Sequence, residues 1–339
     1  PLKAEPDLCQ VHQDKLRESM RLADVISKYE FTHNNSVCEN KKVIEIMSVD
    51  SRGLACQLDH GPDGTGTPLT IKTFLDISHH IPIAVINYLY AMRHGYEFRY
   101  IHLNLHNPTW NVKGTKGHVC RHGLHGERAA PWCKLLGIYD RVKHRTADEI
   151  LFMDTDALFW DHNKTLEDAL NTKSLLDTLD AKKSSFVVAS DIPFNQEMTS
   201  IFNSFGPAKT PMIPACTAVM VFRPNTFLDW FLLQWWNTAD FHTFRLKFPY
   251  EQGTLTHGLL RHDYIRKEHV SLIDWQMMTN LEAQPPNAAD HYIVHLTSGI
   301  RHLTKEMRLG YFVHKLKELG ITTTKQFSEI IETIRREYV

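Results

Sequence analysis

Two aspartates, Asp154 and Asp156, are the residues whose type and spacing best suit chemistry in this chain. They follow the apolar run at 150–153, which is typical of a buried strand, and apolar residues resume at Ala157. Two carboxylates this close together are costly to desolvate unless a cation neutralises them. Mg²⁺ or Mn²⁺ does so with oxygen ligands and shares its remaining positions with substrate phosphates. The pair therefore predicts a site for a divalent cation and a diphosphate.

The position of the pair gives it more weight than the short motif alone. We expect strands at 42–50, 98–103, 149–154, 185–190, 218–222 and 292–295. Helices are expected between several of them, at 83–94, 128–140 and 227–237. This alternation predicts a mostly parallel sheet with helices on both faces, in which ligands bind at the carboxyl ends of strands. The alternative for the two acids is a helix cap or a turn after a strand.

Three parts are expected along the 339 residues: a helical extension at 1–40, a main domain at 41–302, and helices at 303–339 that pack on it. There is no phosphate-binding loop of the G-x-x-x-x-G-K-[ST] type and no G-x-G-x-x-G after a strand. The net charge of −1 gives no global field that would attract nucleic acid or an anionic membrane. No apolar run approaches the roughly 20 residues that span a bilayer. The chain starts at Pro1, so we expect a trimmed N-terminus and membrane attachment only through an anchor removed there.

Six cysteines permit up to three disulfides, and no C-x-x-C pair points to a zinc ribbon or a thioredoxin-like motif. Glycosylation sequons begin at Asn34 and Asn163. These features favour the lumen of the secretory pathway, such as the Golgi, with the cytoplasm as the alternative.

Several segments in a fixed order resemble a known family. They lie at 87–96, 132–134, 150–159, 217–224, 250–253 and 292–299. Together they resemble the GT-A glycosyltransferases, and look closest to the group of galactomannan galactosyltransferases, xyloglucan xylosyltransferases and yeast Golgi α-mannosyltransferases. The resemblance covers about 42–302 and implies the α/β GT-A fold, with a mostly parallel central sheet and a helical C-terminal closure.

The resemblance implies a metal site made of Asp154, Asp156 and His295, because a cation with hard ligands also accepts one imidazole. The alternative for His295 is a strand-end histidine bonded to a backbone carbonyl. Other residues are implied to bind the nucleotide and its phosphates: Ser48, Val49, Asp50, Arg52, Arg128, Lys134, Thr155, Gly299, Arg301 and Lys305. Helical spacing favours a place in the core for the aromatic run at 230–236, and the other possibility is a platform for sugar rings.

Three further residues, Gln252, Glu251 and Asp191, are implied to act on the donor sugar. Gln252 is expected near the anomeric carbon, where the carbonyl dipole of its amide would stabilise an oxocarbenium-like transition state. The alternative for these positions is ordinary loop polarity. The stretches at 57–68 and 104–126 match nothing in the family, and we expect them to determine which acceptor is used.

The function implied is metal-dependent transfer of a sugar, with retention of configuration, from a nucleotide diphosphate donor such as a UDP-sugar to a glycan hydroxyl. Mn²⁺ or Mg²⁺ would be the cofactor. One rival is a catalytically silent GT-A domain that binds glycans or acts as a scaffold. The other is a phosphatase of the D-x-D type, but its motif has Thr or Val soon after the second acid, whereas Ala157 and Leu158 follow here.

Overall fold

The computed structural model of the chain describes residues 42–103, 119–124, 126–171, 174, 181–190, 215–238, 244–245, 250–273, 278–280, 292–296 and 304–337. The helical extension expected at 1–40 lies outside these residues.

The centre of the molecule is a six-stranded sheet with the order β2-β1-β5-β8-β7-β9. Its strands are β1 (Ile44–Asp50), β2 (Glu97–His102), β5 (Glu149–Met153), β7 (Phe186–Ser190), β8 (Ala215–Phe222) and β9 (Val270–Ile273). Neighbouring strands pair in parallel except at β8, which is antiparallel to both β5 and β7. Nearly every residue of these strands is buried, as expected for a sheet covered on both faces. The predicted mostly parallel α/β fold is confirmed.

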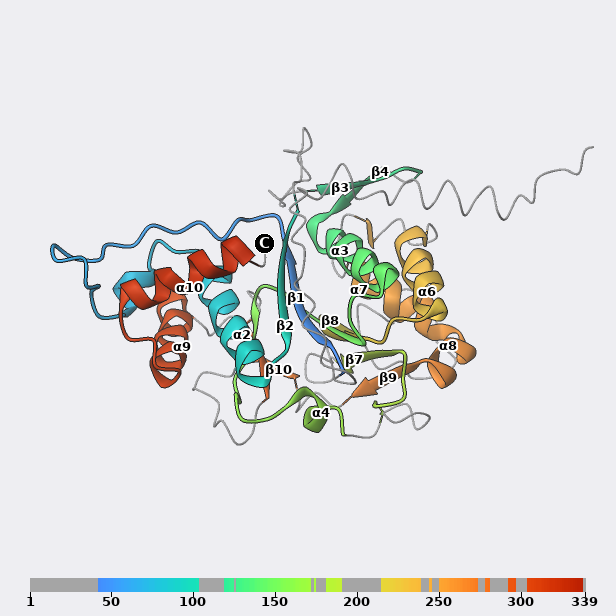
Figure 1. Cartoon of the computed structure of the whole chain (residues 1–339). Helices are drawn as coiled ribbons and strands as arrows, with labels where there is room; N and C mark the ends of the chain where they lie inside the picture. The colour runs from blue at the N-terminus through green and yellow to red at the C-terminus, as the bar shows by residue number, and fades with distance from the viewer. Residues whose placement is uncertain are drawn as a thin grey trace, which may run out of the picture.

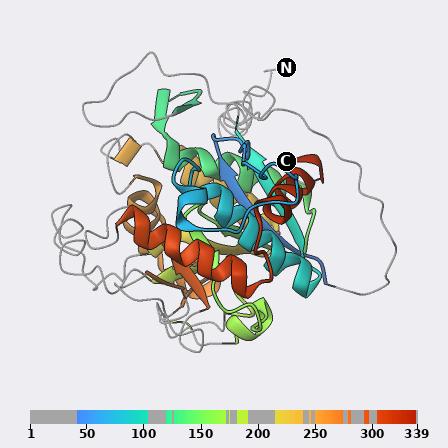
Figure 2. The ribbon, with the colours of Figure 1, turned by 90° about the vertical axis from the view of Figure 1, so that its left-hand side faces the viewer.

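Helices cover both faces of this sheet (Figure 1). On one face lie α2 (His80–His94), α9 (Lys305–Glu318) and α10 (Thr324–Glu337), which Figure 2 shows from their own side. On the other lie α3 (Ala130–His144), α6 (Thr226–Asn237) and α7 (Tyr250–His257). Side chains alternate between the two cores: Ile44 and Ile46 of β1 face the first, and Met47 and Val49 face the second.

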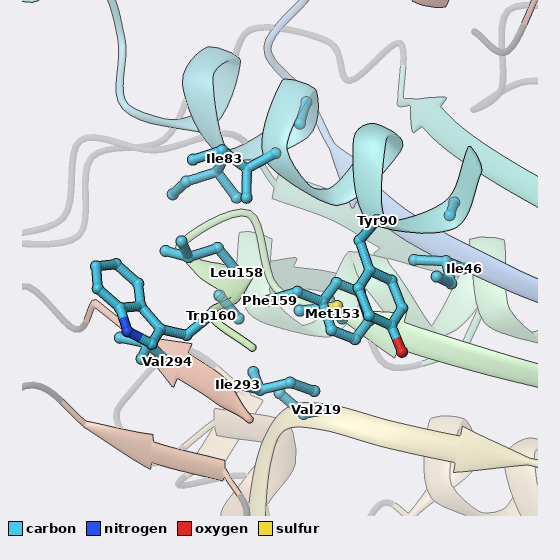
Figure 3. Close-up of a cluster of buried hydrophobic side chains, with 14 of the residues drawn as sticks. Ile46, Ile83, Tyr90, Met153, Leu158, Phe159, Trp160, Val219, Ile293 and Val294 are labelled. Carbon is cyan, nitrogen blue, oxygen red and sulfur yellow. The ribbon is translucent and has the colours of Figure 1, made fainter. Parts of the chain in front are cut away.

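A second, three-stranded sheet follows the end of β5. Its order is β10-β11-β6, with β6 at Ala157–Phe159, β10 at Met278–Asn280 and β11 at Ile293–His295. The buried amide of Asn87 fixes β6 to α2, because it donates to the carbonyl of Ala157 (2.9 Å) and accepts from the amide of Phe159 (3.0 Å). Tyr90 stacks on Phe159 with ring centroids 3.5 Å apart, in the apolar cluster shown in Figure 3. This small sheet positions the late strand β11 beside the aspartate turn.

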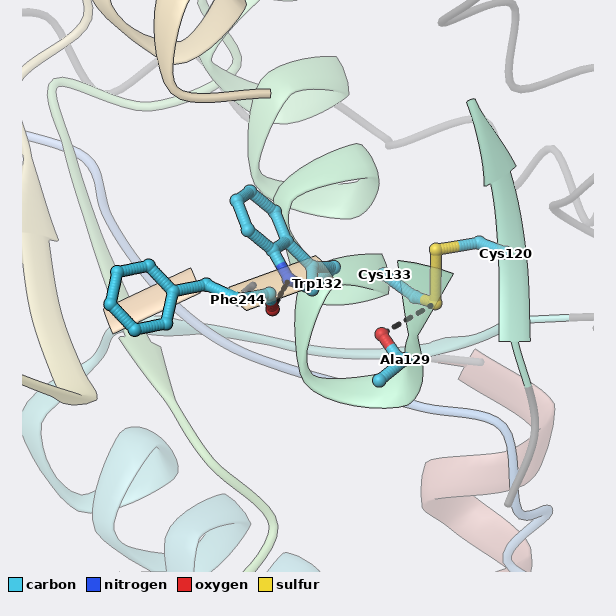
Figure 4. The surroundings of a disulfide bond; sticks show 5 residues. All are labelled: Cys120, Ala129, Trp132, Cys133 and Phe244. Carbon is cyan, nitrogen blue, oxygen red and sulfur yellow. Dashed lines mark hydrogen bonds between the residues drawn. A yellow bond between two sulfur atoms is a disulfide. The ribbon is translucent and has the colours of Figure 1, made fainter. Parts of the chain in front are cut away.

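A hairpin of β3 (Val119–His122) and β4 (Gly126–Ala129) leads into α3. A two-stranded hairpin is marginally stable on its own. Here a disulfide between Cys120 and Cys133 joins β3 to the first turn of α3, with Cα atoms 5.7 Å apart (Figure 4). Among the described residues, Cys56 and Cys216 are cysteines outside any disulfide.

Short elements complete the described chain: η2 (Ile71–Phe74), α4 (Leu166–Ala169), η5 (Leu259–Arg261) and α8 (Asp263–Glu268). The first of the helices expected at 303–339 is α9, which begins at Lys305, where the Thr304 hydroxyl caps it by accepting from the amide of Met307. In the part of the chain that is described, no helix has the length and apolarity that crossing a bilayer requires.

Candidate metal and diphosphate site

Asp154, Asp156 and His295 converge at the carboxyl end of β5. The chain turns after Met153, and the amide of Ala157 donates to the carbonyl of Asp154 (2.9 Å). Ala157 of β6 then pairs with His295 of β11, and the amide of Leu296 donates to the carbonyl of Asp156 (2.7 Å). His295 Nε2 consequently lies 3.1 Å from Asp156 Oδ1. Residues 139 positions apart meet because a short antiparallel pairing joins their backbones.

These three side chains suit a divalent cation. One atom from each, two carboxylate oxygens and an imidazole nitrogen, all lie within 4.8 Å of one another. The two aspartate side chains keep 31% and 30% of their surface exposed, so the acids remain accessible from solvent. A mixed set of oxygen and imidazole ligands suits Mn²⁺ better than Mg²⁺, which prefers oxygen alone.

The charges of the three side chains are strongly coupled. Partial removal from water raises the pKa of Asp154 to about 6; Lys134 opposes this shift, and the like charge of Asp156 adds to it. Burial acts in the same direction on Asp156, but the charge of His295 and its hydrogen bond hold the pKa of Asp156 below its usual range. Burial would lower the pKa of His295, yet Asp156 raises it well above its usual range. The positive charge of His295 therefore partly neutralises the negative charges of Asp154 and Asp156.

Lys134 lies directly behind Asp154. Its ammonium Nζ is 3.1 Å from Asp154 Oδ1 and 2.8 Å from Glu251 Oε1, and it donates to the carbonyl of Thr217 (3.0 Å). The hydroxyl of Thr217 in turn donates to Glu251 Oε1 (2.8 Å). Lys134 is 5% exposed and Glu251 3%. Lys134 was predicted to face the nucleotide or its phosphates, and in the structure its ammonium contacts Asp154 of the pair and Glu251 of α7.

Asp50 and Arg52 connect the end of β1 to the same turn. Arg52 Nε lies 2.9 Å from Asp50 Oδ1, and its Nη2 donates to the hydroxyl of Thr155 (3.0 Å). That hydroxyl donates to Asp50 Oδ2 (2.7 Å). Burial acts against the Asp50 charge, but Arg52 and Thr155 together lower the pKa of Asp50. A cavity of about 630 Å³ opens beside Arg52, between residues 53–59 and the start of α2.

The other residues predicted for the site that the structure describes lie on β1, β4, α7 and α9. Ser48 and Val49 are buried inside β1, and Gln252 is partly buried in α7 beside Glu251. Lys305 is exposed and donates to the carbonyl of Leu75 near the start of α2. Arg128 is stacked between Trp132 and Trp236. Asp191, Gly299 and Arg301 lie outside the described residues.

Two residues near the site were not predicted from the sequence. Thr217 contacts both Lys134 and Glu251, and only its place on β8 beside the end of β5 reveals this. His79 precedes α2, and its charge lowers the pKa of Asp156. A histidine just before a helical run was a signal, but this chain has 21 histidines, so the signal did not stand out.

No family model and no curated protein matches this chain. Among solved structures it is similar to a glycosyltransferase involved in the glycosylation of the major capsid of PBCV-1, with TM-score 0.46, 14% identity, and coverage of 80% of this chain and 98% of that one. It is also similar to the galactosyltransferase LgtC in complex with donor and acceptor sugar analogs, with TM-score 0.40 and 10% identity. The match covers 86% of this chain and 96% of that one. A third similar structure is mouse xyloside xylosyltransferase 1, with TM-score 0.32 and 13% identity. The match covers 50% of this chain and 63% of that one.

All three are glycosyltransferases. That is the class that the sequence resemblance indicates for this chain. The chemistry proposed below rests on the geometry of the site itself.

Proposed function

We propose that this protein is a metal-dependent glycosyltransferase that moves a sugar from a UDP-sugar to a hydroxyl group of a carbohydrate. The observation that carries the proposal is the convergence of Asp154, Asp156 and His295 at a strand end, with ligand atoms within 4.8 Å. A histidine from a strand 139 residues further along the chain adds a nitrogen ligand beside the two acids, which the short motif alone does not supply. The lysine and glutamate buried behind Asp154 also fit a site that handles charge.

Each part of the site has a role in this proposal. Asp154, Asp156 and His295 would hold Mn²⁺, which supplies electrostatic stabilisation of the charge on a departing diphosphate. Lys134 offsets the charge of Asp154 and so keeps that acid ionised at neutral pH for the cation. Asp50, Arg52 and the cavity beside Arg52 would receive the nucleoside, with Ser48 and Val49 forming the strand beneath.

Glu251 and Gln252 would face the donor sugar from the opposite side. Oε1 of Glu251 is held by Lys134 and Thr217, while its buried Oε2 has no partner within the described ranges. A buried carboxylate oxygen without a donor is costly, and a sugar hydroxyl would satisfy it. The neighbouring amide of Gln252 would stabilise an oxocarbenium-like transition state, which agrees with retention of configuration. Asp191, Gly299, Arg301 and Lys305 remain proposed for the donor on the resemblance alone.

The proposed compartment is the lumen of the secretory pathway, the Golgi in particular. The disulfide between Cys120 and Cys133 supports this, since such bonds persist in oxidising compartments.

The test is hydrolysis and transfer of UDP-, GDP- and dTDP-sugars by the full chain, with Mn²⁺ or with a chelator, and with Asp156→Ala in parallel. We expect release of the nucleotide diphosphate from one donor that stops in the chelator and in the variant. Turnover that needs no metal, or that survives Asp156→Ala, would contradict the proposal. Binding of a donor without any turnover would instead favour a silent glycan-binding domain.

A further inference from the structure

A cluster of buried hydrogen-bond donors surrounds Arg128 at the start of α3. Arg128 is 2% exposed, and its guanidinium carbon lies 4.2 Å from the ring centroid of Trp132 and 4.9 Å from that of Trp236. Trp132 is fixed in turn, because its indole donates to the carbonyl of Phe244 (2.9 Å; Figure 4). The two indoles hold the guanidinium by cation–π contact, which fixes its position without neutralising its charge.

Three of the buried donors in this cluster have no acceptor in the described part of the chain: Arg128 Nε, Trp236 Nε1 and Asn237 Nδ2. The amide oxygen of Asn237 is already used, since it accepts from His122 Nε2 (2.6 Å). Buried polar groups are nearly always paired, and an unpaired one costs free energy. Within the described residues, these three groups therefore lack an acceptor.

Arg128 also lacks a counter-ion of its own: among the residues that the structure describes, no carboxylate forms an ion pair with it, and burial and Arg245 alone shift its pKa. Arg245 adds a second positive charge, and burial together with that charge lowers the pKa of Arg128 to about 10. Arg245 lies against β4, since a Cβ on Gly126 would be 3.8 Å from its Nη1. Burying an unpaired cation beside another cation is unfavourable unless an anion joins them.

The N-terminus of α3 adds a third source of positive charge near Arg128. Ala129 at its N-cap offers no side chain to accept from the free amides of the first turn. The positive end of a 15-residue helix therefore lies beside Arg128 without a side-chain cap. A helix start of this kind is a place where oxyanions bind.

We propose that Arg128, Arg245 and the start of α3 form a site for an oxyanion, a carboxylate or a phosphate or sulfate ester, carried by the acceptor. The assignment to the acceptor rests on the proposed function. It follows from position: Trp235, next to Trp236, donates to the carbonyl of Glu251 (2.9 Å). The cluster therefore lies beside α7, the helix that the proposed function assigns to the donor sugar. Arg245 is partly exposed and gives the anion its approach.

The test is calorimetric titration of the full chain with sodium phosphate, sulfate and glucuronate, against sodium chloride at equal ionic strength. We expect millimolar binding of at least one oxyanion, weakened roughly tenfold or more by Arg245→Gln and by Arg128→Met. Arg335→Gln, at an exposed arginine of α10, is the matched control and should bind as the wild type does. Preference for glucuronate would assign a carboxylate, and preference for phosphate or sulfate would assign an ester.

Several outcomes would overturn the inference. One is that no oxyanion binds more tightly than chloride. Another is that Arg245→Gln binds the oxyanion as tightly as the wild type does. The Arg245→Gln variant provides this result even if Arg128→Met fails to fold. A third is displacement of bound phosphate by UDP with Mn²⁺, which would give the two arginines to the donor. Donor hydrolysis is measured separately, so failure here leaves the proposed function standing, and absence of hydrolysis leaves the anion site standing.

Discussion

Lys134 of α3 and Glu251 of α7 form a buried ion pair whose Nζ and Oε1 atoms lie 2.8 Å apart, and the same Nζ contacts Asp154. The first acid of the proposed metal site is thus linked through one ammonium group to the helix that carries Gln252. Burial lowers the pKa of Lys134, but the two acids outweigh it and raise that pKa above its usual value. The lysine is therefore charged at neutral pH.

Removal of this ammonium should destabilise the protein strongly. Lys134→Met leaves the Glu251 carboxylate buried without its cation, which typically costs about 3–5 kcal/mol of unfolding free energy. Urea denaturation measures the loss, with Lys143→Met, an exposed lysine of the same helix, as the control. A loss below about 1 kcal/mol for Lys134→Met would show that the pair is not the buried, coupled group described here.

His295 should contribute directly to metal affinity. His295→Ala removes one of three ligands, and we expect the Kd for Mn²⁺ to rise by roughly tenfold or more, in line with the cost of disturbing a metal site. Titration calorimetry with Mn²⁺ provides the measurement. His144→Ala, at an exposed position of α3, serves as the control. If His295→Ala binds Mn²⁺ as the wild type does, the third ligand is wrongly assigned.

Asn87 should be essential for the small sheet. Its amide satisfies two backbone groups of β6, so Asn87→Leu leaves the carbonyl of Ala157 and the amide of Phe159 buried and unpaired. At about 1–3 kcal/mol for each of these two groups, we expect a loss of about 2–6 kcal/mol in unfolding free energy. Chemical denaturation, with the exposed Asn171→Leu as the control, measures this. A loss similar to that of the control would mean that β6 does not depend on Asn87.

The buried His162 should make stability fall at mildly acid pH. Burial lowers its pKa to about 3, so the folded protein keeps it neutral while the unfolded chain takes up a proton below about pH 6.5. Its contribution is complete above pH 6.5 and is lost as the pH falls from there toward 3. Between pH 7.5 and 5.5 this group alone should cost about 1.4 kcal/mol.

Denaturation of His162→Gln at both pH values tests this. The variant should lose about 1.4 kcal/mol less than the wild type over the same interval. His144→Gln, at an exposed position, should keep the pH dependence of the wild type. An unchanged pH dependence in His162→Gln would show that His162 is not held neutral by burial.

Much of the sheet could be predicted from the sequence, because strands buried on both faces appear as apolar runs. The expected strand at 149–154 is β5 at Glu149–Met153, and that at 98–103 is β2 at Glu97–His102. The antiparallel direction of β8 could not be predicted, since an apolar run is the same in either direction. The short strand β6 was missed, because three residues are too few to show a period.

The part of the candidate site that could be predicted from the sequence consists of residues that lie at the ends of strands. Asp154, Asp156 and His295 were predicted to meet, and their side chains do lie together. The contacts of Thr217 were not predictable, because they depend on which strand lies beside β5. For the aromatic run, Phe231, Trp235 and Trp236 are core residues as helical spacing indicates, whereas Trp230 is 42% exposed.

The central claim is that one site binds a divalent cation and a nucleotide diphosphate together. The most direct test is thermal unfolding of the wild type and of Asp156→Ala, each measured with UDP, with Mn²⁺, with both and with neither. A ligand that binds only the folded state raises Tm in proportion to its binding free energy. We predict that UDP raises the Tm of the wild type only when Mn²⁺ is present, and that Asp156→Ala loses this joint effect. Equal stabilisation by UDP with and without Mn²⁺, or in the variant, would contradict the account.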